Sequence, residues 1–446
     1  MSRKKPQIAR SRASGKTLRS ILQSKLSEAK PYERDINKIN SGARDIINKI
    51  NNSARKLRVK LSPFIGGSLA KGTLVRRKPN EEANEIDIDI FIRFNREEDI
   101  DKFRSVMKAT GEKFKVVHGS RDYVQIKKGS LIFEIIPVLK ISAPKQARNI
   151  TDLSYFHVNY VLKALKKNRK LADEIILAKS FCHGAGCYGA ESYIRGFSGY
   201  ALELLIIEYK TFLSFIKAIA RLKNEAGQKL VIDIEKHYKR ENVLREINEA
   251  KLSSPIILID PTFKERNALA ALSQETFMRF RQHCIKFLKS PSLKLFEHES
   301  VDVEKLKRKA QKKKQDFAII EITTSRQAGD IAGTKLLKFA KLFNEEMKRC
   351  YNKPEMHFEY DERQKGKIYF SGKRIREKII RGPPLNKAED MIRFRKKYGA
   401  AVYEHGGRLM AKIKVNNDPI TVIGQFKKMN GKRMKEMGIT WMEIRG

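Results

Sequence analysis

The first apolar pattern along the chain has helical spacing. Over residues 33–58, five isoleucines recur close to the 3.6-residue period, and these are Ile36, Ile39, Ile46, Ile47 and Ile50. The pattern predicts an opening helix that is interrupted near Gly42. Before it, "LRSILQSKLSEAK" predicts a second helix, reached through a short, flexible and basic N-terminal segment.

Between residues 60 and 140 the pattern changes to short β-rich runs separated by Gly, Ser and Asn. The runs are "KLSPFIGGS", "EIDIDIFIRF", "KFKVVHGS", "YVQIKKGS" and "LIFEIIPVLK". Runs of this length and composition, bounded by turn residues, are typical of strands. They predict a small α/β or α+β sheet domain that ends near residue 145.

From about residue 151 the apolar residues return to three- and four-residue intervals for more than a hundred residues, which predicts a helical domain. A strand at "PIILIDP" and a helix over residues 268–290 close this domain. The charged run 304–315 is interpreted as a linker or a solvated helix face that could also meet a phosphate backbone. Alternating strands and a helix then predict another α+β unit, and Trp441 is assigned to a polar tail.

Size and charge narrow the class of protein. A chain of 446 residues is long enough for about three domains, and it contains no apolar run of about 18 residues that could span a bilayer. The formal net charge of +43 gives a positive potential over much of the surface, which favours a polyanionic partner such as nucleic acid. A generally basic proteome or a high internal salt concentration is the alternative explanation of the charge.

The cysteines indicate a reducing compartment. Cys182, Cys187, Cys284 and Cys350 are too few and too scattered for a disulfide framework. His183 lies between the first two, but the spacing does not fit a zinc knuckle and no second ligand pair follows. We expect buried structural thiols.

Two aspartates interrupt the apolar strand 86–94. Because side chains alternate along a strand, Asp87 and Asp89 share one face while the isoleucines occupy the other. Like charges at this distance repel unless a cation lies between them, and Mg²⁺ prefers carboxylate oxygens. Glu134 interrupts a second apolar run and converges on the aspartates if its strand lies next to theirs. Three acids could then hold two metal ions for displacement at phosphorus, with a solvated edge strand as the alternative for the aspartates.

The preceding stretch "FIGGSLAKGT" adds a phosphate-binding feature. A turn at Gly66, Gly67 and Ser68 can present backbone N–H groups to a phosphate, and Lys71 supplies a charge one turn later. The order of residues is not that of a Walker loop. A Gly-Gly-Ser turn followed by the Asp-x-Asp strand and a later acid is much more specific than either element alone.

Together, "GGSLAKGT", "DIDIFIRF" and "FEIIP" resemble the signature of the polymerase β-like nucleotidyltransferase superfamily. More narrowly, the chain resembles the archaeal-type (class I) CCA-adding tRNA nucleotidyltransferases through "AKSFCHGAGCYGAESYIRGFSGYALELLI", "IDPTFKERNALAALS" and "KSPSLKLF". The resemblance covers most of residues 35–300 and is loose beyond them. Compared with the family pattern, Glu134 replaces Asp, Lys71 replaces Arg and Leu69 replaces an aromatic residue.

The resemblance implies an α+β fold with four parts. These are a basic N-terminal extension (1–32), a polymerase β-like catalytic head of mixed sheet and helices (33–150), a helical neck with the start of the body (151–290), and an α+β body and tail (291–446). The implied activity is template-independent addition of C, C and A from CTP and ATP to the 3′ end of tRNA. The expected location is the cytoplasm, without a membrane partner, and a homodimer is one option for assembly.

The resemblance also implies roles for individual residues. Asp87, Asp89 and Glu134 would bind Mg²⁺ and serve as the catalytic carboxylates, and the nucleotide-binding residues would be Gly67, Ser68, Lys71, Ser154, His157, Lys179, Tyr188 and Arg266, with Arg266 selecting the base. Structural alternatives remain for four of them. Tyr188 and His157 could be core residues, Lys179 could lie on a solvated helix face, and Arg266 could only pair with Asp260.

Two other functions compete with CCA addition. The first is a poly(A) polymerase-like terminal transferase, which would share the head but not the specificity. The second is a non-catalytic RNA-binding relative with an inactive head, against which the three acids at 87, 89 and 134 argue.

Overall fold

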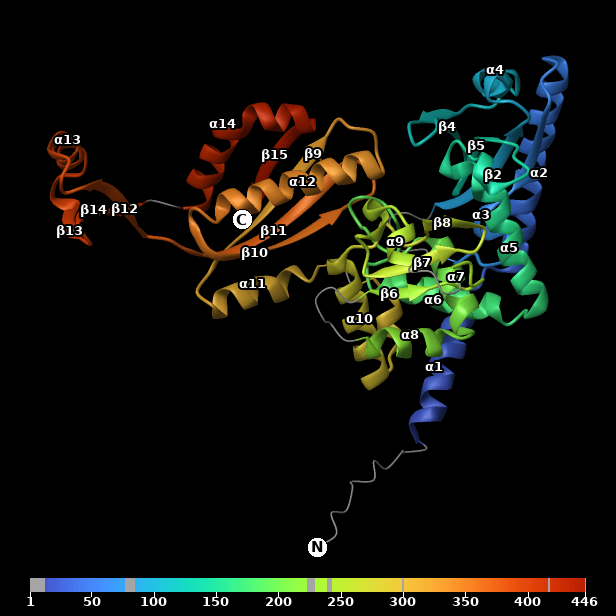
Figure 1. Ribbon diagram of the computed structural model, residues 1–446, viewed down its shortest axis with the longest axis horizontal. Helices are drawn as coiled ribbons and strands as arrows, with labels where there is room; N and C mark the ends of the chain where they lie inside the picture. The colour runs from blue at the N-terminus through green and yellow to red at the C-terminus, as the bar shows by residue number, and fades with distance from the viewer. Residues whose placement is uncertain are drawn as a thin grey trace, which may run out of the picture. The chain divides into compact units, whose positions relative to one another are not determined.

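The computed structural model describes residues 13–76, 85–222, 229–238, 243–298, 301–415 and 418–445. The chain divides into two compact units, Met1–His298 and Glu299–Gly446. Each unit contains both helices and strands (Figure 1), so the α+β class is confirmed. The predicted flexible basic segment lies outside the described residues up to residue 12, and its remainder is helical, because α1 begins at Ala13.

The first unit carries a sheet followed by a helical layer. Its helices are α1 (Ala13–Ala29), α2 (Glu33–Lys56), α3 (Gly67–Ala70), α4 (Phe103–Ala109), α5 (Ser154–Lys167), α6 (Leu171–Gly184), α7 (Gly199–Tyr209), α8 (Phe212–Arg221), α9 (Val243–Glu246) and α10 (Gln274–Lys289). Its strands are β1 (Leu61–Ile65), β2 (Ile86–Phe94), β3 (Lys115–Val117), β4 (Tyr123–Lys128), β5 (Leu131–Leu139), β6 (Leu230–Ile232), β7 (Ile256–Asp260) and β8 (Phe263–Asn267).

The five strands predicted between residues 60 and 140 all form, and they make one sheet in the order β1-β2-β5-β4-β3. Strands β2 and β5 run parallel, and the other neighbours are antiparallel. Ile88, Ile90 and Ile92 are fully buried in the core that the sheet shares with α2 and α4. The predicted alternation along β2 is therefore confirmed, and it leaves the aspartates on the opposite face.

The predicted interruption of the first isoleucine-rich helix was wrong, because α2 runs without a break through Gly42. A Cβ at Gly42 would lie 2.9 Å from the Phe133 ring of β5. The glycine is thus explained by the close approach of the helix to the sheet and not by a kink.

The helical layer of the first unit has its own core. Buried aromatic and aliphatic side chains of α6, α7, α8 and α10 pack there, among them Phe181, Phe212 and Phe280. The N-terminal helix α1 packs its apolar side chains against the same core. The small sheet β6-β7-β8 adjoins it and contains the predicted strand "PIILIDP" as β7. The predicted helix at 268–290 begins later, because Ser273 caps α10 by accepting a hydrogen bond from Thr276 N.

The second unit contains two sheets. Its helices are α11 (Val303–Lys312), α12 (Asp330–Met347), α13 (Ala388–Tyr398) and α14 (Pro419–Met437), and its strands are β9 (Asp316–Thr324), β10 (Tyr351–Tyr360), β11 (Lys365–Arg374), β12 (Glu377–Pro384), β13 (Val402–His405), β14 (Arg408–Lys414) and β15 (Ile439–Arg445). One sheet has the order β10-β11-β9-β15 and carries α12 and α14 on one face (Figure 1). The other has the order β12-β14-β13 and packs against α13.

The basic run 304–315 is mostly helical in α11 (Val303–Lys312), and its charged side chains are exposed, so the predicted solvated helix face is confirmed. One prediction for the second unit was wrong. Trp441 does not lie in a tail, because β15 pairs with the central strand β9. The apolar residues of β15 do not alternate regularly with polar ones, since Trp441 and Met442 are adjacent, and the strand begins directly after a helix, so it was missed.

Three of the four cysteines are buried and all four are free thiols, as expected. In the part of the chain that the structure describes, no helix has both the length and the apolar character needed to cross a membrane.

Candidate active site

The carboxylates predicted for catalysis lie on two neighbouring strands. The parallel pairing of β2 with β5 places Asp89 in register with Glu134. Neighbouring strands lie about 4.8 Å apart, so these two side chains are direct neighbours on one face. Asp87 is on the same face two residues earlier and is exposed, whereas Asp89 and Glu134 are half-buried. The condition set from the sequence, that the strand of Glu134 lies next to that of the aspartates, is met.

The proximity of these acids changes their acidity. Burial, with repulsion from Asp89, raises the pKa of Glu134 to about 7, although Gln125 Nε2 donates a hydrogen bond of 2.9 Å to its Oε1. Burial likewise raises the pKa of Asp89, and the charges of Lys71 and Lys179 oppose that rise. The two carboxylates therefore lack full compensation of their charge from the described part of the chain.

Among the described residues, no three carboxylate, imidazole or thiol groups stand close enough to form a closed metal site. The donor set on β2 and β5 nevertheless fits a hard divalent cation, because it offers carboxylate oxygens on one face. Burial raises the pKa of both Asp89 and Glu134, and Asp89 also repels Glu134, so a cation between them would stabilise their charged forms. The residues thus fit Mg²⁺, provided that the carboxylates draw together around it.

The predicted phosphate turn lies directly against Asp89. Gly66 N donates a hydrogen bond of 2.9 Å to Asp89 O, and Gly67 then adopts a φ of +56° at the start of α3. A Cβ on Gly67 would lie 1.8 Å from Asp89 Oδ2, which no side chain tolerates. Glycine at 67 is required by both its backbone conformation and this contact. The turn and Ser68 are in this way held beside the acid of β2.

A buried ionic cluster lies behind the turn. Glu203 of α7 is fully buried, and its carboxylate receives Lys71 Nζ at 2.6 Å and Lys179 Nζ at 2.8 Å. Thr73 Oγ1 donates to the same carboxylate at 3.0 Å and accepts from Lys179 Nζ at 3.0 Å. Lys179 is 3% exposed, so the alternative of a solvated helix face is wrong. The cluster joins the turn to helices α6 and α7.

Burial alone would raise the pKa of Glu203, but Lys179 and Lys71 outweigh it and lower the pKa to about 2. Glu203 was missed from the sequence, although it is the only charged residue between Gly199 and Ile207. An acid in a helix segment that is otherwise apolar was the available indication. Burying a carboxylate requires a partner, and here two lysines supply it.

Tyr188 lies against the same cluster. A Cβ on Gly199 would come within 2.8 Å of Tyr188 Oη and 3.7 Å of Lys179 Cε. The Tyr188 ring stacks on His183 with a centroid distance of 3.9 Å, and burial raises the pKa of the phenol. Tyr188 is therefore half-buried beside the lysines, in agreement with a place in the site and also with a structural role.

A second buried carboxylate, Asp260 at the end of β7, organises three further side chains. Arg266 Nη1 donates to Asp260 Oδ2 at 2.6 Å, and His157 Nε2 lies 3.0 Å from the same oxygen. Tyr200 Oη donates to Oδ1 at 3.1 Å, and its ring stacks on His157 with a centroid distance of 4.1 Å. Burial raises the pKa of Asp260, but His157, Arg266 and its hydrogen bonds lower it well below the usual range.

This arrangement answers the alternative for Arg266 in part. The pairing with Asp260 exists, yet the guanidinium keeps further donors and its side chain is 20% exposed. Burial lowers the pKa of His157, and Arg266 and Lys71 contribute in the same direction. Lys71 is thus close enough to influence the pKa of His157, which links the side chains around Asp260 to those around Glu203. Ser154 begins α5 one helical turn before His157 and is half-buried.

Comparison with known proteins shows what the chain is similar to. Residues 173–297 match the family model for the second domain of tRNA nucleotidyltransferases. The chain is 40% identical over 219 residues to the CCA-adding enzyme of Nanoarchaeum equitans, which covers 48% of this chain and 52% of that relative. It is 28% identical over 407 residues to the CCA-adding enzyme of Methanocaldococcus jannaschii, covering 86% of this chain and 85% of that relative.

A third relative, the CCA-adding enzyme of Pyrococcus abyssi, is 33% identical over 297 residues, covering 63% of this chain and 61% of the relative. The match thus spans about half of the Nanoarchaeum relative and most of the Methanocaldococcus relative. A solved structure of a cytoplasmic RNA terminal U-transferase covers 64% of this chain and 99% of that chain, with a TM-score of 0.48 and 14% identity.

The sheet β1-β2-β5-β4-β3 carries the paired acids, and residues 173–297 match the second domain of tRNA nucleotidyltransferases. In sequence, the chain is similar to archaeal CCA-adding enzymes.

Proposed function

We propose that this protein adds C, C and A from CTP and ATP to the 3′ end of tRNA without a nucleic-acid template. The observation that carries the proposal is the register of Asp89 with Glu134, directly beside the turn at Gly67. Such a pair of acids next to a phosphate-binding turn suits phosphoryl transfer. The similarity to archaeal CCA-adding enzymes supports tRNA as the acceptor and CTP and ATP as the donors.

In this proposal Asp87, Asp89 and Glu134 hold Mg²⁺, which when bound would neutralise the triphosphate and favour ionisation of the attacking hydroxyl. Asp87 is exposed, so it stands nearest to solvent and to an entering nucleotide. Without a bound cation the pKa of Glu134 is about 7, and a bound Mg²⁺ would lower it by favouring the carboxylate. Phosphoryl transfer needs mainly positioning, and the paired strands place the acids on one face of the sheet.

Lys71 and Lys179 would act on the triphosphate through their net charge. Two ammonium groups share one carboxylate, so the group with Glu203 carries a charge of +1 that a phosphate would balance. Gly67 and Ser68 would offer the backbone N–H groups of the turn, and Ser154 the first turn of α5. Tyr188 would pack beside the lysines at the ribose.

Arg266 would select the base, with His157 beside it. Its fixed fork can use the donors that Asp260 leaves free, and a wrong base would leave those buried donors unpaired. Replacing Arg266 with Lys should therefore reduce the preference for C and A over U by about tenfold or more in single-nucleotide incorporation. If the preference for C and A over U is unchanged in this variant, Arg266 has only the structural role of pairing with Asp260.

The decisive experiment incubates the full chain with Mg²⁺ and tRNA lacking its 3′ end, together with each labelled nucleotide in turn. We expect two C residues and then one A residue to be added. Addition of many A residues without C would support the poly(A) polymerase-like alternative. No incorporation of any nucleotide by the folded protein would support the non-catalytic RNA-binding relative.

The charge of +43 is consistent with a tRNA partner, since phosphate contacts supply affinity without sequence readout. An enzyme of this kind would work in the cytoplasm, and a homodimer stays one option for its assembly. The boundaries at residues 32, 150 and 290 remain predictions of the functional parts within the two structural units.

A further inference from the structure

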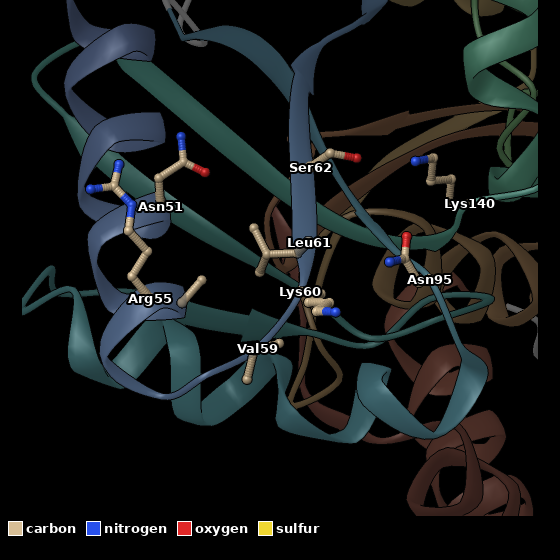
Figure 2. Close-up of a pocket in the computed structure, with 9 residues that line it drawn as sticks. Asn51, Arg55, Val59, Lys60, Leu61, Ser62, Asn95 and Lys140 are labelled. Carbon is tan, nitrogen blue, oxygen red and sulfur yellow. The ribbon is translucent and has the colours of Figure 1, made fainter.

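A polar cavity lies at one end of the sheet β1-β2-β5-β4-β3. This is the end where β1 begins, and the turn at Gly67 follows the other end of β1. The volume of the cavity is about 350 Å³, and its lining includes Arg55, Lys60, Ser62, Asn95 and Lys140. Figure 2 shows Arg55 extending from α2 on one side, Lys60 just before β1 and Ser62 on β1 in the middle, and Asn95 and Lys140 on the other side. The side chains come from segments far apart in the sequence and surround one hollow.

The cavity is strongly cationic. Three of its lining residues, Arg55, Lys60 and Lys140, carry positive charge, and none of its lining residues is acidic. Within the described ranges, none of these three cations has an acidic partner within ion-pair distance, although many other lysines and arginines of the unit do. Cations that face one cavity without compensation favour an anion there.

Two buried polar atoms support the same conclusion, one in the lining of the cavity at Ser62 and one on its cross-strand neighbour Arg93. Ser62 Oγ is buried and has no hydrogen-bond partner in the described structure, and Arg93 Nε is in the same state. Ser62 and Arg93 are cross-strand partners in the β1–β2 register, so their side chains share one face. Buried polar groups are normally hydrogen-bonded, and a phosphate oxygen in the cavity could accept from Ser62 Oγ, whereas Arg93 lies on the adjoining face outside the lining of the cavity.

The face that leads from the acids to the cavity is aromatic and cationic. Along β2 it presents Asp89, then Phe91 and then Arg93, which lies about 13 Å from Asp89 at the usual rise per residue. The Arg93 guanidinium lies 4.2 Å from the centre of the Tyr155 ring, and Phe64 stacks on Phe91 with a centroid distance of 5.1 Å. Tyr155 is 39% exposed, so a base could stack on it.

We propose that this cavity holds a backbone phosphate of the RNA strand a few nucleotides upstream of the 3′ end, with the upstream bases lying over Tyr155. The inference rests on the proposed function. The turn at Gly67, and Glu203 with its two lysines, lie toward the other end of β1 and are assigned to the donor nucleotide. The RNA acceptor is then left with the path along β2 toward Arg93 and the cavity.

The test measures RNA affinity without nucleotide, so that it does not depend on catalysis. The full chain is titrated with fluorescently labelled tRNA lacking its 3′ end over a series of salt concentrations. In the Lys60→Ala/Lys140→Ala double variant, Kd should rise about five- to tenfold at physiological salt, and the slope of log affinity against log salt should fall by about 1 per lysine. The double variant Lys60→Arg/Lys140→Arg should keep the wild-type slope.

A matched control is Lys108→Ala, since Lys108 is exposed on α4 of the same unit and does not line the cavity. It should change Kd by less than about twofold, the small effect of one surface charge away from the bound strand. Melting curves check that each variant is folded, and Lys140→Gln replaces the double variant if that variant is not. Kinetically, KM for tRNA should rise while KM for CTP stays unchanged.

An unchanged Kd and salt slope in the folded double variant would overturn the proposal. A second arm adds inorganic phosphate and follows the melting temperature. If phosphate stabilises the wild type and not the double variant while both bind tRNA equally, the cavity is a site for small anions and the RNA assignment is wrong. Failure of the wild type to add C and A would instead contradict the proposed function and leave the affinity result intact.

Discussion

Glu134 and Glu203 are two glutamates of the same unit whose pKa values shift in opposite directions. Both interrupt apolar elements, β5 and α7, and both lose much of their contact with water. Burial and the neighbouring Asp89 raise the pKa of Glu134 to about 7, whereas Lys179 and Lys71 bring the pKa of Glu203 to about 2 despite its burial. The difference lies in the partners and not in the depth of burial.

The negative charge of Glu203 is balanced by lysines of the chain itself, whereas that of Glu134 is not and could be balanced by a bound cation. Glu203 receives three hydrogen bonds from side chains of its own unit, so it can hold the turn, α6 and α7 together without any ligand. Glu134 has Gln125 as a neutral partner and Asp89 as a repulsive neighbour. Such an arrangement costs stability unless a cation binds, which is a common feature of functional sites.

The largest expected effect comes from removing an uncompensated acid. Asp89→Asn should lower the rate of nucleotide incorporation by about 10³-fold or more, equal to about 4 kcal/mol, because a carboxylate proposed to bind the metal is lost. Its melting temperature should not fall, since the substitution relieves repulsion with Glu134. Incorporation is measured with labelled CTP, and Asp101→Asn, an exposed acid of the same unit, is the control. Retained activity in Asp89→Asn would contradict the assignment.

Removing the compensated acid should act on stability first. Glu203→Gln leaves the buried Lys71 and Lys179 without a carboxylate, which should lower the free energy of unfolding by about 3 kcal/mol or more in urea titrations. Glu208→Gln on the same helix is exposed and should stay within about 0.5 kcal/mol of the wild type. A Glu203→Gln protein as stable as its control would show that the ionic group is not structural.

The smallest effect sharpens the comparison through pH. The pKa of Glu134 is raised from 4.5 to about 7, so between these values the folded protein keeps a proton that the unfolded chain releases, and stability falls as pH rises. Without divalent cations, Glu134→Gln should therefore melt about 2–4 °C above the wild type at pH 8 and equally at pH 4.5. Added Mg²⁺ should reduce the difference at pH 8. The same difference at both pH values would exclude this titration as its cause.

Local patterns were sufficient for much of the head. The alternation in "EIDIDIFIRF" predicted both the strand and the shared face of its aspartates, because a half-buried strand imposes a period of two. The strand of Glu134 was also found, and its place beside β2 was stated as a condition that the register of Asp89 with Glu134 then met.

What sequence reasoning missed depends on contacts between distant segments. The role of Glu203 follows from Lys71, which lies 132 residues away, and no local pattern reveals that pairing. Gly42 was interpreted as a break in α2 because the contact that requires a glycine there, with the Phe133 ring of β5, is equally remote in sequence. Trp441 was placed in a tail because β15 is recognisable only from its pairing with β9.

The contact between Gly67 and Asp89 has a practical use for reading related sequences. Since a single methyl group at position 67 would come within 1.8 Å of the Asp89 carboxylate, any side chain there must displace the acid from its place on β2. A relative that retains both aspartates but carries a larger residue at this point of the turn should thus have lost catalysis. One position could in this way sort working heads from those retained only to bind RNA, even where every acidic residue is present.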